Sequence, residues 1–207
     1  MIRFLDLLFS FLGLILLLPF LFFIGLIIKV GSRGPVFYKQ SRVGLNGVDF
    51  NVFKFRTMKM NSDKLGLITV GGRDPRITLV GIFLRKYKLD ELPQLLNVFI
   101  GDMSLVGPRP EVKKYVDLYT VEQRKVLSVC PGITDWASIY YRNENLILGQ
   151  SFDPEKDYIE KVMPDKLNYN LIYIRNYGTK EYFKIIFITF WRIGFPKKKI
   201  LPLQDEK

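Results

Sequence analysis

The sequence contains no histidine and only one cysteine, Cys130, among its 207 residues. The lack of histidine excludes serine–histidine–carboxylate catalysis, histidine metal sites and imidazole general bases. A single cysteine excludes an intramolecular disulfide and a cysteine zinc site. Any catalysis must therefore use carboxylates, lysine, arginine, hydroxyl groups or a hard cation held by oxygen ligands.

Charge is also absent from Leu7 to Ile28, between Arg3 and Asp6 on one side and Lys29 on the other. A bilayer-spanning helix needs about 20 such residues. No small-residue cleavage site follows the run, which argues against a signal peptide. Buried core helices rarely stay apolar all round for this length. We therefore predict a membrane element over residues 1–30.

Two topologies fit this element. Pro19 lies in the middle of the run, where it removes a backbone hydrogen bond and kinks a helix. Arg3 precedes the run, whereas Lys29 and Arg33 follow it. The positive-inside tendency places both flanks in the cytoplasm, as a re-entrant helix hairpin would. A simple kinked span is equally compatible with the residues.

Lysine and arginine number 31 and aspartate and glutamate 20, so the net charge is 31 − 20 = +11. This balance favours anionic partners such as phosphates, acidic lipid surfaces or nucleic acid. The length fits one domain with an appended membrane element, which we divide into a membrane helix at 1–30, a catalytic domain at 31–195 and a basic tail at 196–207.

The pattern beyond the membrane element predicts a small α+β domain that is mostly helical with a short β element. Val36–Tyr38 and Phe50–Phe53 are strand-prone, with a turn at Leu45–Gly47 between them. The expected elements after the polar link at 61–72 are a helix to about Tyr87, a helix from Leu92 through Leu95, Leu96 and Phe99, a helix at Glu111–Val129, a strand at Trp136–Tyr141 and a helix at Asp153–Tyr177. The aromatic segment Tyr182–Ile193, followed by Lys197–Lys199, predicts an interfacial amphipathic helix, with a core helix as the alternative.

Asp90 and Glu91 form an acidic pair just before Pro93. Proline is tolerated in a helix's first turn, and the apolar periodicity begins at Leu92, so the pair lies at a helix N-terminus. The helix dipole favours negative charge there. When the pair is considered alone, a simple helix cap is the favoured explanation.

Several cations favour a phosphate-handling site. Arg85 precedes the acidic pair, and Lys54 and Arg56 lie two residues apart. Arg109 stands in the stiff loop Gly107-Pro108-Arg109-Pro110, where its guanidinium can be held in place for phosphate.

Three stretches of the sequence resemble the bacterial sugar transferases, the monotopic polyprenyl-phosphate phosphoglycosyl transferases. The resemblance covers nearly the whole chain, and the stretch from Leu89 to Pro110 is highly specific. The matching stretches are Gly34–Gln40 running into Lys54–Met58, Leu84–Arg85 with Leu89–Leu95, and Asn97–Pro110.

The resemblance implies transfer of a sugar-1-phosphate from a UDP-sugar to undecaprenyl phosphate, with release of UMP and a requirement for Mg²⁺. It implies that Asp90 and Glu91 are the catalytic pair and that Asp90 forms a covalent phosphosugar intermediate. It also implies that the Pro19 helix is re-entrant, at the cytoplasmic face of the bacterial inner membrane. The expected partners are a nucleotide-sugar donor, polyprenyl phosphate, membrane lipids and downstream glycosyltransferases.

We assign the remaining residues as hypotheses. Asp90 and Glu91 would contact the metal, Arg85 the lipid phosphate or diphosphate, and Arg109 within Gly107–Pro110 the nucleotide. Lys54, Arg56 and Arg142 are further phosphate-binding candidates, although surface salt bridges explain them almost as well. Arg42 is a weaker candidate of the same kind.

The chain departs from the family pattern after Thr134. Glycine is expected at Asp135 and glutamine at Ser138, and two tyrosines follow at 140 and 141. This stretch could shape the sugar pocket, so the transferred sugar stays open. Only one apolar segment is found, so we expect the small form without the additional N-terminal spans of larger relatives.

The rival interpretations are a many-span lipid-phosphate transferase, a direct ternary transfer, an inactive scaffold and a membrane-tethered basic nucleic-acid binder. Nucleic acid is not expected as a partner, because no helix-turn-helix, zinc or RNP-like aromatic motif is found. Release of UMP from UDP-sugars would favour the transferase, whereas salt-sensitive DNA retention without such release would favour the nucleic-acid binder.

Overall fold

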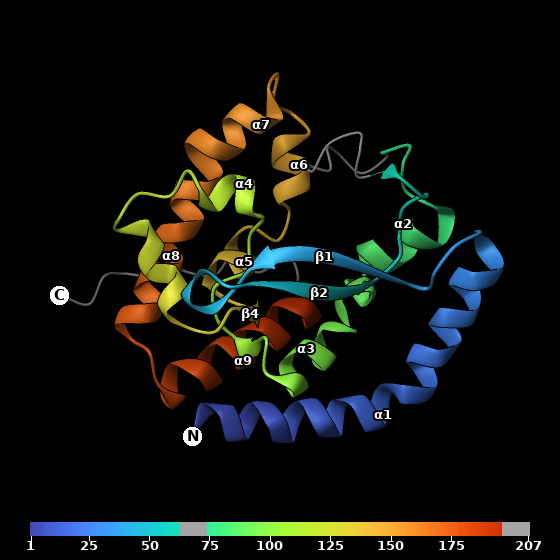
Figure 1. Cartoon of the computed structure of the whole chain (residues 1–207), viewed down its shortest axis with the longest axis horizontal. Helices are drawn as coiled ribbons and strands as arrows, with labels where there is room; N and C mark the ends of the chain where they lie inside the picture. The colour runs from blue at the N-terminus through green and yellow to red at the C-terminus, as the bar shows by residue number, and fades with distance from the viewer. Residues whose placement is uncertain (63–73, 196–207) are drawn as a thin grey trace.

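A computed structural model describes residues 1–62 and 74–195. This part is mostly helical and contains two small two-stranded sheets (Figure 1). The expected mixed, predominantly helical fold is therefore confirmed. The basic tail at 196–207 and most of the polar link at 61–72 lie outside the described residues.

One long helix lies at the N-terminus, and shorter helices surround a β-hairpin. In chain order they are α1 (Ile2–Gly31), β1 (Phe37–Val43), η1 (Leu45–Gly47), β2 (Asp49–Phe55), α2 (Leu79–Lys86), η3 (Leu89–Glu91), α3 (Gln94–Ile100), β3 (Ser104–Val106), α4 (Lys113–Val116), η4 (Gln123–Ser128), β4 (Gly132–Thr134), α5 (Trp136–Tyr140), α6 (Glu144–Leu148), α7 (Pro154–Asp157), the π-helix η5 (Tyr158–Val162), α8 (Met163–Arg175) and α9 (Thr179–Gly194).

Helix α1 is long and apolar enough to cross a membrane by length and composition. Pro19 lies inside it, and most of its side chains are exposed. Figure 1 shows α1 running along one edge of the fold and then turning upward along the side. Proline accounts for a bend of this kind, because it lacks the N–H and its ring clashes with the preceding turn.

Strands β1 and β2 form an antiparallel hairpin, with register from Phe37↔Phe55 to Val43↔Asp49. The turn contains Asn46 and Gly47, both at positive φ. The predicted hairpin is confirmed, and its strands are longer than expected because the pairing continues up to the turn.

The predicted helix over Glu111–Val129 is wrong as one continuous helix, because the stretch contains two short helical segments. The Glu111 backbone pairs with β1 instead, since its carbonyl accepts from the Val43 N–H at 2.9 Å. Farther on, the Thr120 N–H donates to Gln123 Oε1 (2.9 Å) and the Gln123 N–H donates to Thr120 Oγ1 (3.3 Å). This reciprocal capping box starts a new helical segment and divides the stretch into α4 and η4.

The predicted strand at Trp136–Tyr141 is also wrong, because this segment is helix α5. The buried Asp135 caps it, its Oδ1 accepting from the Ser138 N–H at 2.6 Å. An aspartate cap strongly favours a helix start, and it overrides the strand preference of the aromatic residues. The strand lies earlier, at β4, which pairs in parallel with β3.

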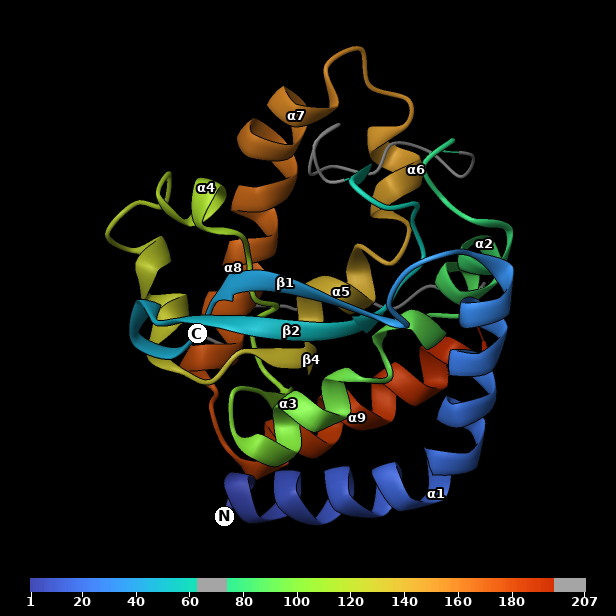
Figure 2. The ribbon, with the colours of Figure 1, turned by 45° about the vertical axis from the view of Figure 1, so that its right-hand side comes forward.

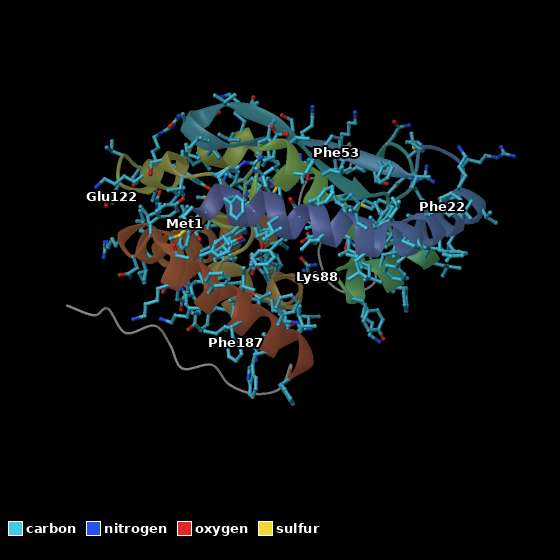
Figure 3. All side chains as sticks on the ribbon, turned by 90° about the horizontal axis from the view of Figure 1, so that it is seen from below. Met1, Phe22, Phe53, Lys88, Glu122 and Phe187 are labelled. Atoms are coloured by element: carbon cyan, nitrogen blue, oxygen red, sulfur yellow. The ribbon has the colours of Figure 1, made fainter. Side chains whose placement is uncertain are left out.

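The predicted helix at Asp153–Tyr177 is confirmed in outline as α7, η5 and α8. Helix α9 buries Tyr182 and Ile185, and it exposes Phe187 and Phe190 on its other side. Viewed from below, α1 crosses the face from Met1 towards Phe22, and α9 with Phe187 lies beside it (Figure 3). The membrane-interfacial role of α9 stays a prediction.

Candidate functional site

The acidic pair lies in η3, a short turn between α2 and α3. Lys88 has φ 59°, a left-handed conformation that redirects the chain out of α2. Pro93 is the N-cap of α3, and among the described residues no side chain caps this end. The predicted position before a helix is therefore confirmed, but Asp90 is not the cap of that helix.

The start of helix α2 packs directly against the backbone of Thr57, just after β2. The Thr78 N–H donates to the Thr57 carbonyl at 2.9 Å, and Thr78 Oγ1 caps the helix by accepting from the Gly81 N–H at 3.0 Å. A Cβ at Gly81 would collide with the Thr57 carbonyl. Glycine thus permits the close approach that brings Arg85, in the last turn of α2, to the acidic pair.

Glu91 is clamped by two cations. Arg109 grips both of its carboxylate oxygens, with Nη1 3.2 Å from Oε2 and Nη2 on Oε1, and Lys54 Nζ lies 3.4 Å from Oε1. Burial alone would raise the pKa of Glu91, but Arg109 and Lys54 hold this pKa well below its usual range. Glu91 also raises the pKa of Arg109. Glu91 is therefore a permanent anion that fixes two cations.

Asp90 has a different environment. The residue is 7% exposed, and its Oδ1 is buried without a hydrogen-bond partner in the part of the chain that the structure describes. Burial, and next the charge of Glu91, raise the pKa of Asp90, while Lys54 and Arg85 oppose the shift. A raised pKa makes the carboxylate more basic. No donor among the described residues saturates this oxygen, so its lone pairs are not committed to another protein group.

Arg85 is the third cation of the site, after Arg109 and Lys54. Burial lowers the pKa of Lys54 to about 8, although Glu91 stabilises its charged form. Burial also lowers the pKa of Arg85, which the charge of Asp90 counteracts. Both side chains thus lie within electrostatic range of the acidic pair, as the sequence predicted. The site combines two carboxylates with three cations from β2, α2 and the loop at 107–110.

The Gly107–Pro110 loop is held at several points. Gly107 and Gly132 approach so closely that a Cβ on Gly107 would lie 3.0 Å from the Gly132 nitrogen. The Gly132 N–H donates to the Pro108 carbonyl at 3.0 Å, and the Arg109 N–H donates to the buried Asp135 Oδ2 at 3.2 Å. The backbone around Arg109 is therefore fixed before any substrate binds.

Glu111 strengthens the same loop from the other side. Its carboxylate accepts from Arg42 Nη1 (2.7 Å) and from the Tyr158 hydroxyl, and Arg42 also donates to the Pro110 carbonyl at 3.2 Å. Neither Glu111 nor Asp135 was among the expected site residues. Asp135 was visible in the sequence only as a departure from the family pattern, and Glu111 carried no local signal.

Two of the expected phosphate-binding residues lie elsewhere. Arg56 donates to the carbonyls of Ser32 (2.9 Å) and Arg33 (2.8 Å), just beyond the end of α1. Arg142 donates to the Arg192 carbonyl in the last turn of α9 at 2.5 Å. Both guanidinium groups thus bind carbonyls at helix ends, and Arg56 also donates to Ser32 Oγ at 2.8 Å.

The donor set fits Mg²⁺ in part. Among residues 1–62 and 74–195 there is no group of three or more histidine, cysteine or acidic residues that could hold a metal. Magnesium is commonly bound by one or two carboxylates together with substrate phosphates and water. Asp90, with its unpartnered Oδ1, suits that arrangement, whereas Glu91 is engaged by Arg109 and Lys54.

The arrangement is suited to phosphoryl transfer. Such chemistry requires a positioned nucleophile and neutralisation of charge, and it has no obligatory general base. Asp90 supplies a carboxylate, while Lys54, Arg85 and Arg109 supply positive charge around it. No histidine is needed for any of these roles.

Comparison with known proteins agrees with this geometry. Residues 1–195 match the family model described as bacterial sugar transferase. The chain is 38% identical over 201 residues to the UDP-glucose:undecaprenyl-phosphate glucose-1-phosphate transferase of Escherichia coli (strain K12), covering 93% of this chain and 40% of that protein. It is 50% identical over 116 residues to an uncharacterized sugar transferase of Bacillus subtilis (strain 168), covering 56% and 55%.

A third relative differs in its sugar. This is the UDP-N-acetylgalactosamine-undecaprenyl-phosphate N-acetylgalactosaminephosphotransferase of Aeromonas hydrophila, 36% identical over 181 residues, which cover 85% of this chain and 39% of the relative. The matched region thus spans between 39% and 55% of the length of these three relatives. Because the family model matches nearly the whole chain, this protein belongs to the bacterial sugar transferase family.

Proposed function

We propose that this chain transfers a sugar-1-phosphate from a UDP-sugar to a polyprenyl phosphate, such as undecaprenyl phosphate, and releases UMP. The names of the E. coli and A. hydrophila relatives describe transfers of this type. The observation that carries the proposal is the buried Asp90 Oδ1, which lacks a hydrogen-bond partner among the described residues and lies beside Glu91, a carboxylate already paired with Arg109 and Lys54.

The reaction proceeds in two displacements. A carboxylate oxygen of Asp90 attacks the sugar-bearing phosphorus of the donor, and the bond from this phosphorus to the bridging oxygen breaks, so that UMP leaves with the electron pair. An oxygen of the polyprenyl phosphate then attacks the same phosphorus and breaks the acyl phosphate bond. Asp90 is regenerated, and the product carries the sugar on a diphosphate.

The surrounding residues have distinct roles in this scheme. Arg109 and Lys54 bind donor phosphate oxygens while Glu91 keeps both cations in place. Arg85 neutralises the phosphate nearest Asp90. When bound at Asp90, Mg²⁺ supplies further charge neutralisation at the diphosphate.

We also propose that α1 is re-entrant and that both substrates are bound at the cytoplasmic face of the inner membrane. The support is the bend in α1 with Pro19 inside it, the positive charge at both ends and the exposed apolar surface of α1. In this topology, the chain acts at the first membrane step of bacterial glycoconjugate synthesis.

A trapping experiment tests the covalent step. The full chain in lipid nanodiscs is incubated with a panel of UDP-sugars without lipid acceptor, and peptides are examined by mass spectrometry. We expect UMP release of up to one equivalent and a phosphosugar adduct on Asp90 for the sugar that the enzyme accepts. If no adduct forms and Asp90→Asn remains active, the covalent scheme is refuted and a direct ternary transfer replaces it.

A further inference from the structure

The first turns of α1 contain an unusual feature for a membrane helix, a buried carboxylate. Asp6 is 2% exposed and Ser10, one turn later, is fully buried. A carboxylate on an apolar membrane helix is costly unless it is hydrogen bonded, and such residues commonly mark function. Its contacts therefore indicate what the helix does beyond anchoring.

Asp6 binds the strand that leads to Arg109. One oxygen, Oδ1, accepts from the Leu105 N–H at 2.9 Å and from the buried Tyr182 hydroxyl at 2.9 Å. Leu105 is the middle residue of β3, whose other edge pairs with β4. Because β3 continues directly into Gly107–Pro110, Asp6 secures the second edge of the strand that carries the Arg109 loop.

Arg3, one turn earlier, binds the helix that follows the acidic pair. Its Nη1 donates to the Val98 carbonyl at 2.5 Å and its Nη2 to the Phe99 carbonyl at 2.8 Å, at the end of α3. A cation is favourable at a helix C-terminus, where carbonyl groups lack partners. Figure 2 shows the first half of α1 lying beneath both α3 and α9.

These contacts join the two halves of the site. Glu91 precedes α3 and Arg109 follows β3, so their ion pair, with Nη1 3.2 Å from Oε2, bridges the two elements that α1 holds. We propose that Asp6, supported by Arg3, is a positioning residue that aligns the Arg109 loop with the acidic pair. This inference rests on the proposed function for its kinetic consequences, but the hydrogen bonds themselves can be tested separately.

The chemistry of Asp6 permits a matched pair of variants. Asp6→Asn keeps an Oδ1 that can accept both hydrogen bonds, whereas Asp6→Leu has a similar size, suits a membrane helix and leaves both donors unpaired. Leu8→Ala, at an exposed position of α1, controls for altered membrane binding. Each full-length variant is prepared in nanodiscs and assayed for UMP release, and backbone hydrogen exchange is followed over residues 104–110.

We expect Asp6→Leu to raise the donor KM roughly tenfold, as for loss of about 1.4 kcal/mol of binding, with the lipid KM unchanged. We also expect faster exchange over 104–110, and we expect Asp6→Asn and Leu8→Ala to match the parent. The inference is overturned if Asp6→Leu lowers only kcat, if exchange over 104–110 is unchanged, or if Asp6→Asn is as impaired as Asp6→Leu. If the parent releases no UMP from any UDP-sugar, the proposed function fails, and the exchange comparison still decides whether Asp6 holds the loop.

Discussion

Lys54 should give the enzyme an alkaline limit near pH 8. Burial lowers the pKa of this lysine to about 8, and its Nζ lies 3.4 Å from Glu91 Oε1. With that pKa, roughly 90% of Lys54 is charged at pH 7 and roughly 10% at pH 9. If donor binding needs the charged form, kcat/KM for the UDP-sugar falls about tenfold over this interval.

The assay is UMP release at saturating polyprenyl phosphate, with kcat/KM for the donor measured from pH 5 to 9.5. This ratio reports ionisations of the free enzyme, so the comparison with the structure is direct. Lys54→Arg keeps its charge over the whole range, and its profile should stay level up to pH 9.5. Lys54→Met should be weak at every pH and should lose the alkaline limb.

The same variant moves the acid limb in a direction that the structure specifies. Asp90 must be ionised to attack, so activity is present above its pKa and is lost as the pH falls through that value. Lys54 lowers the pKa of Asp90, so Lys54→Met should shift the acid limb to higher pH. A parent profile that is level between pH 7 and 9.5, or an alkaline limb near 8 that persists in Lys54→Arg, would refute the reasoning.

Three further predictions concern the Glu91–Arg109 ion pair, the contact of Gly81 with the Thr57 backbone and the membrane helix α1. Glu91→Gln leaves Arg109 without its counter-ion. We expect this variant to lose about 2 kcal/mol in the free energy of unfolding and to have a roughly hundredfold lower kcat/KM. An unchanged denaturation curve in detergent would contradict this expectation. Gly81→Ala should lower the free energy of unfolding by about 3 kcal/mol, because its Cβ would collide with the Thr57 backbone. In Gly13→Ala the Cβ would lie 3.4 Å from a side-chain carbon, so its free energy of unfolding, measured in the same thermal denaturation, should stay within about 1 kcal/mol of the parent. Pro19→Ala restores the helical hydrogen bond, so α1 should straighten and cross the bilayer. A cysteine placed at the N-terminus, in a background without the native cysteine, should then become labelled from the periplasm. Identical labelling of parent and variant would count against a re-entrant helix.

The acidic pair was predictable because its signals are local. Pro93 and the apolar spacing from Leu92 place Asp90 and Glu91 before a helix, and the structure agrees. The hairpin was predictable for the same reason, since its turn and alternating strands lie within one short stretch. The raised pKa of Asp90 and the lowered pKa of Glu91 were not predictable, because they depend on which cations the fold brings to each carboxylate.

The errors at Glu111–Val129 and Trp136–Tyr141 have a common cause. In both stretches, apolar residues suggested one continuous element, and a short polar side chain decided where the helix actually starts. The Thr120–Gln123 capping box was present in the sequence and could have been recognised. Asp135 was also visible, but its choice of helix over strand is coupled to the Arg109 backbone, which lies far away in the sequence.

The arginines show where sequence spacing stops being informative about chemistry. Lys54 and Arg56 are two residues apart, yet β2 ends at Phe55, and Arg56 turns to the carbonyls after α1 while Lys54 reaches Glu91. Arg3 and Arg142 bind carbonyls at the ends of α3 and α9 in the same way. Every helix end leaves carbonyl groups that need donors, so a basic chain with many short helices must commit part of its positive charge to them. A surplus of lysine and arginine therefore indicates anionic substrates only after the contacts of each side chain are known. Here Arg3, Arg56 and Arg142 bind carbonyls at helix ends, whereas Lys54, Arg85 and Arg109 lie around the acidic pair.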